Sequence, residues 1–180
     1  MIWWLAAVLL PPCAGAQLAL HESGHAISSL TLGSGVRRFR PWLTKVGSRR
    51  YFGYVEYDFD YSGSQRWKNA VRAVVPIAGA VVFSFLWGGL ALAADGAART
   101  VFAVAWICAS LDALNNLEPL KLRTDDLVDS IEWLLPPIVT PGAIRPDTQR
   151  ATRIARWVGG ALCVPLLGWV AFVALLLGVS

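Results

Sequence analysis

Four long apolar segments, separated by polar loops, are the feature that most limits how this chain can fold. They cover residues 2–32, 70–94, 100–120 and 154–179, and the first contains Pro11 and Pro12. At about 1.5 Å of rise per helical residue, each is long enough to cross the ~30 Å hydrocarbon layer of a bilayer. We therefore expect an all-α polytopic membrane protein with about four transmembrane helices, forming a single membrane-embedded domain over residues 1–180.

The composition excludes the common soluble classes. Hydrophobic residues make up 56% of the 180 residues and charged residues only 16%, whereas soluble domains carry about 25% charged residues. A chain of this length has too little interior to hide so many apolar side chains from water. The same figures exclude a disordered chain and a disulfide scaffold.

The basic residues are unevenly divided between the loops. One group lies in residues 37–72 and another in residues 121–156, whereas the short turn between the second and third segments has only Arg99. The positive-inside rule therefore predicts that both basic loops face the cytoplasm and that both termini lie outside. No nucleic-acid-binding motif accompanies the basic clusters, so we expect the lipid bilayer, and no nucleic acid, as a partner.

The start of the chain has a second interpretation as a cleaved signal peptide. Residues 2–10 are apolar and are followed by the small residues Ala14, Gly15 and Ala16, as at a cleavage site. However, no positive charge precedes the apolar run. Cleavage would also remove the helix that holds the histidine motif described below, so we expect the segment to be retained.

The loop over residues 33–69 predicts a small β-ribbon between the first two spans. From Tyr54 onward, apolar and aromatic residues alternate with the acids Glu56, Asp58 and Asp60, which is a strand-like period of two. Such a strand either anchors at the membrane interface through its aromatic residues or pairs with an unfolded peptide by strand addition. A short helix is predicted over residues 124–135, with Thr124 as its N-cap.

The first span contains the sequence His21-Glu22-Ser23-Gly24-His25, an HExxH motif. Residues i and i+4 share one face of a helix, so both imidazoles can bind one zinc ion, with Glu22 beside them to take a proton from water. These are the only two histidines in the chain. A cluster of ionisable residues inside a membrane span is costly unless it has a function.

A hydrolytic zinc site needs a third protein ligand, which cannot be histidine here. Carboxylates gather around the end of the third span, namely Asp112, Glu118, Asp125, Asp126, Asp129 and Glu132. Asp112 and Asn116 lie one helical turn apart and give this span a polar face. The residues by themselves leave the choice of the third ligand open.

These motifs resemble the site-2 protease (peptidase M50) family of intramembrane zinc metalloproteases. The family combines HExxH in an early span with Asn-x-x-Pro and then Asp-Gly in a later one. This chain has Asn116-Leu117-Glu118-Pro119, followed by Thr124-Asp125-Asp126. In addition, Pro76-Ile77-Ala78-Gly79-Ala80 resembles the small-residue segment of the family's middle span. The resemblance extends from about Gln17 to Leu127.

The resemblance implies Asp125 as the third ligand, because Thr124-Asp125 aligns with the start of the family's Asp-Gly motif. Asp126 and Asp112 are the alternatives, because the family's glycine is replaced by Asp126 and the spacing from Pro119 is longer than usual. The segment Thr124-Asp125-Asp126-Leu127 is also similar to the ligand segment of the AAA-linked, membrane-anchored zinc proteases, which favours Asp126.

The function implied is that of a zinc-dependent intramembrane endopeptidase with one Zn²⁺ per chain. Its ligands would be His21, His25 and Asp125, with Glu22 as the general base and Asn116 at the oxyanion. The substrate would be the membrane-embedded segment of another protein, with a single-span segment favoured, presented by the ribbon and cleaved toward the cytoplasmic side. The alternatives are an inactive relative that binds membrane partners, and a different membrane zinc hydrolase whose third ligand is Glu118 or Glu132.

Overall fold

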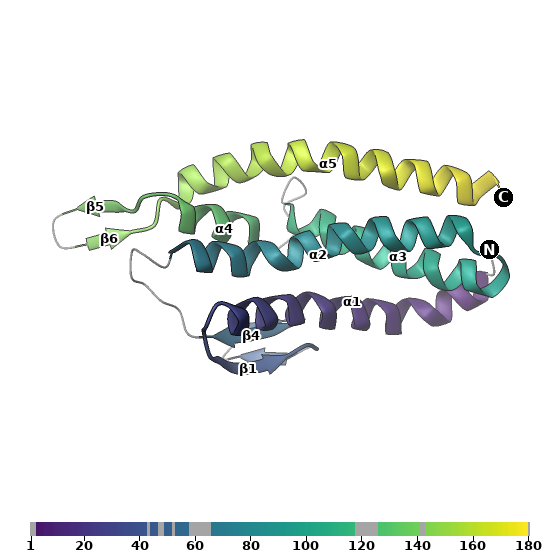
Figure 1. Ribbon diagram of the computed structural model, residues 1–180, viewed down its shortest axis with the longest axis horizontal. Coiled ribbons are helices and arrows are strands. Elements are labelled where there is room, and N and C mark those ends of the chain that lie inside the picture. Colours follow the sequence, from purple (N-terminus) through teal and green to yellow (C-terminus); the bar gives the residue numbers. More distant parts are fainter. Residues whose placement is uncertain are drawn as a thin grey trace.

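Four long helices dominate the computed structural model, which describes residues 3–42, 44–46, 49–51, 53–57, 66–117, 126–140 and 143–179. They are α1 (Trp3–Thr31), α2 (Arg66–Ala93), α3 (Gly96–Asn116) and α5 (Thr148–Val179). All four are long and apolar enough to cross a membrane (Figure 1). The prediction of an all-α polytopic membrane protein with a small ribbon between its first two spans is confirmed.

The helices differ from the apolar segments mainly at their polar ends. Helix α2 begins at Arg66 rather than at residue 70, and α5 begins at Thr148 rather than at residue 154. Hydropathy detects only the part of a helix that is apolar, whereas arginine, lysine and glutamine continue a helix readily beyond it. Helix α1 remains continuous through Pro11 and Pro12.

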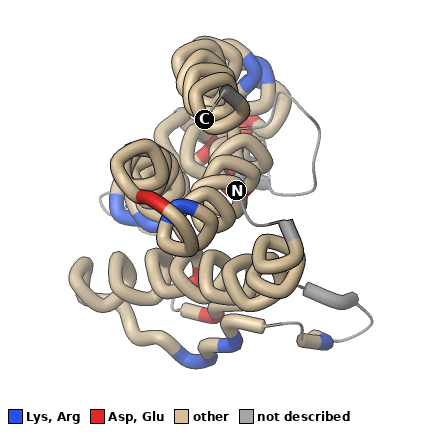
Figure 2. The backbone as a smooth tube through the Cα atoms, turned by 90° about the vertical axis from the view of Figure 1, so that its right-hand side faces the viewer, with Lys and Arg blue, Asp and Glu red and all other residues tan. Residues whose placement is uncertain are grey.

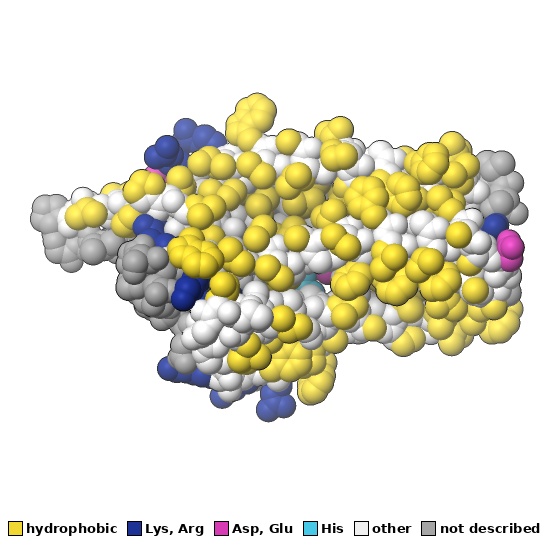
Figure 3. All heavy atoms as spheres, in the orientation of Figure 1, with side chains coloured by type: hydrophobic (Ala, Val, Ile, Leu, Met, Phe, Trp, Pro, Cys, Tyr) yellow, Lys and Arg dark blue, Asp and Glu magenta, His cyan; other side chains and the backbone are white. Residues whose placement is uncertain are grey.

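The helices form three layers. The α2–α3 hairpin lies in the middle, with α5 on one side and, on the other, α1 with the strands that connect it to α2 (Figures 1 and 2). Both termini lie at the end that carries the α2–α3 turn, and the strands and α4 (Asp126–Leu134) lie at the opposite end. Hydrophobic side chains cover much of the long flank seen in Figure 3, and basic side chains gather at the strand-bearing end.

The ribbon between α1 and α2 consists of two nested antiparallel pairs. Strand β1 (Val36–Arg40) pairs with β4 (Tyr54–Tyr57), and β2 (Thr44–Val46) pairs with β3 (Arg49–Tyr51). All four residues of β4 are half-buried, so its two faces differ less than the sequence alternation predicts. The acids Asp58 and Asp60 of the predicted pattern lie outside the described residues.

Chain reversal at the end of α1 brings β1 back along the helix. Gly33 has a positive φ of 80°, which glycine adopts without steric cost. The amide of Gly33 donates to the Leu30 carbonyl and the amide of Ser34 donates to the Ser29 carbonyl, which satisfies carbonyls at the helix end. The ribbon therefore leaves α1 about two turns beyond His25 and then folds back against the helix.

The short helix α4 lies within the predicted range of residues 124–135 and packs against both α2 and α5. Leu127 and Val128 are buried in a core cluster with Ala151 and Ala155 of α5. The Ser130 hydroxyl donates to the Ala70 carbonyl of α2 at 3.0 Å. A further hairpin, β5 (Ile138–Thr140) with β6 (Ala143–Arg145), was not predicted.

Candidate metal centre

One face of α1 carries Gln17, His21 and His25 at intervals of four residues and turns them toward α2 and α3. Gln17 and His21 are buried, with 8% of His21 exposed. Gly24, on the adjoining face, allows the close approach of α2, because a Cβ added there would lie 3.2 Å from the Cα of Pro76. The absence of a side chain at Gly24 thus helps to bring the two histidines against the α2–α3 hairpin.

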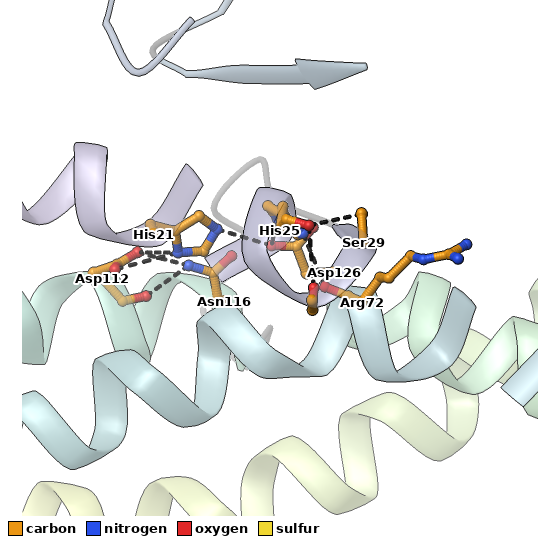
Figure 4. Close-up of polar contacts among 8 residues, drawn as sticks. His21, His25, Ser29, Arg72, Asp112, Asn116 and Asp126 are labelled. Carbon is orange, nitrogen blue, oxygen red and sulfur yellow. Dashed lines mark hydrogen bonds and ion pairs between the residues drawn. The ribbon is translucent and has the colours of Figure 1, made fainter. Parts of the chain in front are cut away.

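Both histidines meet the carboxylate of Asp126, the first residue of α4. The Nε2 atoms of His21 and His25 lie 3.1 Å and 3.5 Å from Asp126 Oδ2. The centroids of the two imidazole rings are 5.2 Å apart, and the ring planes are inclined at 72° to each other. The three side chains each offer one ligand atom, and these atoms all lie within 4.8 Å of one another (Figure 4). Residues from two elements far apart in the sequence therefore form one compact group.

The packing of α4 determines where Asp126 lies. Its neighbours Leu127 and Val128 are buried in the core, and the Ser130 hydroxyl bonds to the backbone of α2. Burial by itself raises the pKa of the Asp126 carboxyl, but the hydrogen bonds and positive charge of His21 and His25 outweigh it and hold the pKa below its ordinary value.

Asp112 of α3 lies on the other side of the His21 ring. His21 Nδ1 is 3.2 Å from Asp112 Oδ1 and 3.3 Å from its Oδ2. Gln17 Nε2 donates to the same carboxylate at 2.8 Å. Asn116 Nδ2 also donates to it at 2.8 Å (Figure 4). One imidazole cannot present Nδ1 and Nε2 to the same ion, so Asp112 is placed to orient His21 rather than to complete the group around Asp126.

His25 is held in a similar way, by the backbone of α2. Its Nδ1 lies 3.0 Å from the carbonyl oxygen of Arg72, so an Nδ1–H donating there leaves Nε2 with its lone pair toward Asp126. Metal-binding histidines typically donate their second ring N–H to a carboxylate or a backbone carbonyl, which fixes the tautomer and the ring orientation. Both histidines of this chain have such a partner.

Arg72 itself is buried, with only 1% of it exposed. Its guanidinium donates to Asn69 Oδ1 and to Ser34 Oγ, and it lies over the Tyr57 ring at 5.6 Å from the centroid. Burial, followed by the negative charge of Asp126, raises the pKa of Tyr57 to about 12. Arg72 therefore joins α2 to the end of α1 and to β4, while its carbonyl oxygen faces His25.

Glu22 is buried beneath the ribbon, with 8% of it exposed. Gly53, which precedes β4, lies so close that an added Cβ would overlap the Glu22 carboxyl group. A side chain at position 53 would therefore displace Glu22 or the ribbon, and this constraint comes from close approach rather than from the backbone angles. The ribbon covers the acidic residue that the HExxH motif places beside the histidines.

Asn116 does not offer an N–H for an oxyanion in this arrangement. Its Nδ2 donates to the Asp112 carbonyl at 2.9 Å and to the Asp112 carboxylate. Its Oδ1 is buried and has no hydrogen-bond partner among the described residues. Rotating the Asn116 amide by half a turn would exchange its Oδ1 and Nδ2. The amide oxygen would then face the Asp112 carboxylate, and this hydrogen bond would be lost because both groups are acceptors.

The other carboxylates considered from the sequence have different places. Asp125 and Glu118 lie outside the described residues. Glu132 is away from the group, where its Oε1 accepts a hydrogen bond from the Thr148 hydroxyl. The sequence did not single out Gln17, Gly53 or Arg72, although Gln17 falls one helical turn before His21 and Arg72 is the only charged residue in the apolar segment 70–94.

Two of the three separations in the donor set are compatible with a tetrahedral zinc ion. Zn–N and Zn–O bonds of about 2.0–2.2 Å in a tetrahedron separate neighbouring ligand atoms by roughly 3.3–3.5 Å. The Nε2–Oδ2 separations of 3.1 Å and 3.5 Å are close to this range. Two imidazoles and one carboxylate also match the ligand types of hydrolytic zinc sites, which leave the fourth position for water.

No model of a known protein family matches the chain, and no curated protein or solved structure is significantly similar to it. The resemblance to the site-2 proteases therefore rests on the sequence motifs quoted above.

Proposed function

We propose that this protein is a zinc-dependent intramembrane endopeptidase that hydrolyses peptide bonds in membrane-embedded segments of other proteins. The observation that carries the proposal is the convergence of His21 Nε2, His25 Nε2 and the Asp126 carboxylate, with a separate hydrogen-bond partner for the second nitrogen of each ring. A buried structural histidine needs only one hydrogen-bond partner. Two histidines on one helix face, each with one ring nitrogen hydrogen-bonded and the other directed at a shared carboxylate, favour a metal site.

The proposed ligands are His21, His25 and Asp126, with Asp125 as the alternative that the resemblance implies. A bound zinc ion would supply Lewis acidity and lower the pKa of water from about 16 toward about 7. Asp112 keeps His21 in the tautomer whose Nε2 is free to bind, and the Arg72 carbonyl does the same for His25. Gln17 and Asn116 hold the Asp112 carboxylate in place.

Glu22 is the proposed general base. It accepts a proton from the attacking water and returns it to the leaving amine as the peptide bond breaks. Its burial under Gly53 excludes bulk water from this transfer. Asn116 Oδ1, which has no hydrogen-bond partner among the described residues, is an acceptor, so we assign it to a substrate or water N–H or O–H rather than to the oxyanion.

A transmembrane substrate must unwind before its carbonyls can be attacked, because helical carbonyls are already hydrogen-bonded. Among the described residues, β1 and β4 pair only with each other and both contact α1, so strand addition to an outer edge would hold an unwound segment near Glu22. We therefore propose that the ribbon binds the unwound substrate segment. The alternative is that it only anchors the protein at the membrane surface.

Cleavage of a membrane-embedded test substrate by the purified protein in lipid tests the proposal. A Glu22→Gln variant should retain about one zinc per chain and lose cleavage by at least about a hundredfold, the usual scale of general-base catalysis. Glu132→Gln is the matched control and should cleave as the wild type does. Unchanged cleavage in the Glu22 variant would rule out the mechanism, and a zinc-loaded but inactive wild type would favour the binding-protein alternative.

Zinc content of single variants assigns the third ligand. Asp126→Ala should lower zinc affinity far more than Asp125→Ala, because Asp126 is the carboxylate that meets both histidines. Full zinc retention in the Asp126 variant, with loss in the Asp125 variant, would transfer the role to Asp125. Loss of zinc only in Glu132→Ala would support the alternative of a different membrane zinc hydrolase with Glu132 as its third ligand.

We also propose that the strand-bearing end faces the cytoplasm. The described basic residues gather at this end, whereas Arg99 lies at the α2–α3 turn (Figure 3). In cells, a membrane-impermeant thiol reagent should label a cysteine at exposed Ala97 and leave one at exposed Thr140 unlabelled, with the native cysteines replaced. The reverse labelling would invert the topology.

A further inference from the structure

The first turns of α5 carry arginines on a face that points away from the rest of the protein. Arg150, Arg153 and Arg156 are all exposed. Ala151 and Ala155, on the opposite face, are completely buried, and one turn further Gly159 lies against the Leu117 carbonyl. Helical geometry thus separates a packed stripe of small residues from an outward arginine face.

The arginine face continues directly into an apolar surface along the same helix. Trp157, Val164 and Leu175 are 80%, 72% and 65% exposed. At 1.5 Å per residue, Val164 lies about 16 Å beyond Arg153 toward the other end of the helix. Trp157 stands between the two regions, as tryptophan does at the boundary of the headgroups and the hydrocarbon.

The arginines have no acidic partner on their own helix, since residues 148–179 contain neither aspartate nor glutamate. Among the described residues, none of the three guanidinium groups makes an ion pair. The Asp147 carboxylate just before the helix accepts a hydrogen bond from the backbone amide of Arg150 instead. Three cations are therefore available to an outside anion at this end of α5.

We propose that Arg150, Arg153 and Arg156 bind the phosphate-containing headgroup of an anionic phospholipid whose acyl chain lies along Trp157 and Val164. Guanidinium groups bind phosphate through paired N–H donors, and clustered juxtamembrane arginines attract anionic lipids. An occupant that satisfies both regions needs an anionic head joined to an apolar tail. A soluble polyanion would meet the arginines but would leave the apolar surface below them uncovered.

Native mass spectrometry of the full chain can test the site, using mixed phosphatidylglycerol and phosphatidylcholine. We expect the wild type to retain phosphatidylglycerol preferentially. The variant Arg150→Gln/Arg153→Gln/Arg156→Gln should retain it at least about tenfold less, as expected for the loss of three charges near a membrane surface. Because these side chains are exposed, the variant should keep the wild-type unfolding temperature.

The matched control is Arg37→Gln/Arg38→Gln/Arg40→Gln on β1, which changes the net charge by the same amount. It should alter phosphatidylglycerol retention by less than about twofold. The proposal would be overturned if the α5 variant retained as much phosphatidylglycerol as the wild type, or if both variants lost it equally. It would also be overturned if the wild type retained phosphatidylcholine as well as phosphatidylglycerol. Complete displacement of the lipid by glycerol phosphate or by an oligonucleotide would also overturn it, because the acyl chain would then contribute nothing.

Discussion

Asp112 is a half-buried carboxylate that is placed to orient His21 in the proposed zinc site without binding the metal itself. It receives hydrogen bonds from Gln17 and Asn116 and lies against His21 Nδ1. We expect Asp112→Ala to weaken zinc binding by about 10- to 100-fold, the usual effect of removing a group that orients a ligating histidine. Zinc titration of the purified variant measures this change.

The control for this variant is Asp95→Ala, because the Asp95 side chain is almost fully exposed at the α2–α3 turn. It should bind zinc like the wild type. A complete loss of zinc in the Asp112 variant, equal to that of Asp126→Ala, would instead make Asp112 a ligand.

Gly53 is the residue whose replacement should most directly disturb Glu22, the proposed general base. A Cβ at this position would overlap the Glu22 carboxyl, so the ribbon or Glu22 must move in Gly53→Ala. Misplacement of a catalytic group by about 1 Å can cost on the order of a hundredfold in rate. We expect cleavage to fall by about that factor while zinc content stays at one per chain.

Gly15→Ala is the comparison for Gly53→Ala, because nothing lies within 4 Å of a Cβ at Gly15. Its cleavage should be unchanged. Wild-type cleavage by Gly53→Ala would show that the ribbon yields at no cost and does not position Glu22.

Between elements, Arg72 is the residue that connects α1, α2 and β4. Arg72→Met removes its hydrogen bonds to Asn69 and Ser34 and its cation–π contact with Tyr57. Unpartnered buried polar groups and a lost cation–π contact together should lower the free energy of unfolding by about 2–4 kcal/mol. Thermal unfolding gives this change, and hydrogen exchange should show faster opening of residues 54–57.

Lys68→Met provides the control, because Lys68 is a half-buried cation one turn earlier on the same helix. It should leave the exchange of β4 unchanged. If hydrogen exchange of β4 became equally faster in both variants, loss of positive charge rather than loss of the specific contacts of Arg72 would be what loosens the ribbon.

The ribbon should also respond to alkaline pH through Tyr57. Its pKa is raised, chiefly by burial, from the ordinary 10.0 to about 12. Between these two values the unfolded chain has lost the phenolic proton and the folded protein keeps it, so stability is full below pH 10 and falls as the pH rises toward 12. We expect a loss of about 1–3 kcal/mol over this interval.

Unfolding measured across this pH range in the wild type and in Tyr57→Phe isolates the contribution of Tyr57. The difference between the two proteins should change with pH in the stated direction. A constant difference would mean that Tyr57 titrates normally and that β4 is not packed against Arg72 as described.

For the molecule as a whole, the close approach of α5 to the end of α3 links the bundle to the candidate metal centre. A Cβ on Gly159 would overlap the carbonyl oxygen of Leu117 and would lie 3.3 Å from Leu127, the neighbour of Asp126. Gly159→Ala should therefore destabilise the protein by about 1–3 kcal/mol, the usual cost of overpacking. Thermal unfolding in detergent measures it.

The adjacent Gly160 supplies a matched comparison on the same helix. Nothing lies within 4 Å of a Cβ at Gly160, so Gly160→Ala should be neutral or stabilising by up to about 1 kcal/mol, the helix preference of alanine over glycine. Equal effects of the two substitutions would contradict the close packing of α5 on α3.

The sequence by itself determined the number and approximate positions of the spans. Hydrophobicity and helical periodicity are local properties, so the four apolar segments, the ribbon and the short helix could be predicted from neighbouring residues alone. The spacing of His21 and His25 is local as well, because it follows from the 3.6-residue turn of one helix. The helix ends were less predictable, since polar first turns carry no apolar signal.

Only the tertiary structure decided which distant groups meet the histidines. Asp112, Asp126 and Arg72 come from three other helices, and the sequence offered several carboxylates with no physical basis for choosing among them. The choice follows from the packing of α4 through Leu127, Val128 and Ser130, which carries Asp126 to Nε2 of both rings and leaves Asp112 on the far side of His21. Such placement depends on contacts between surfaces that no local pattern encodes.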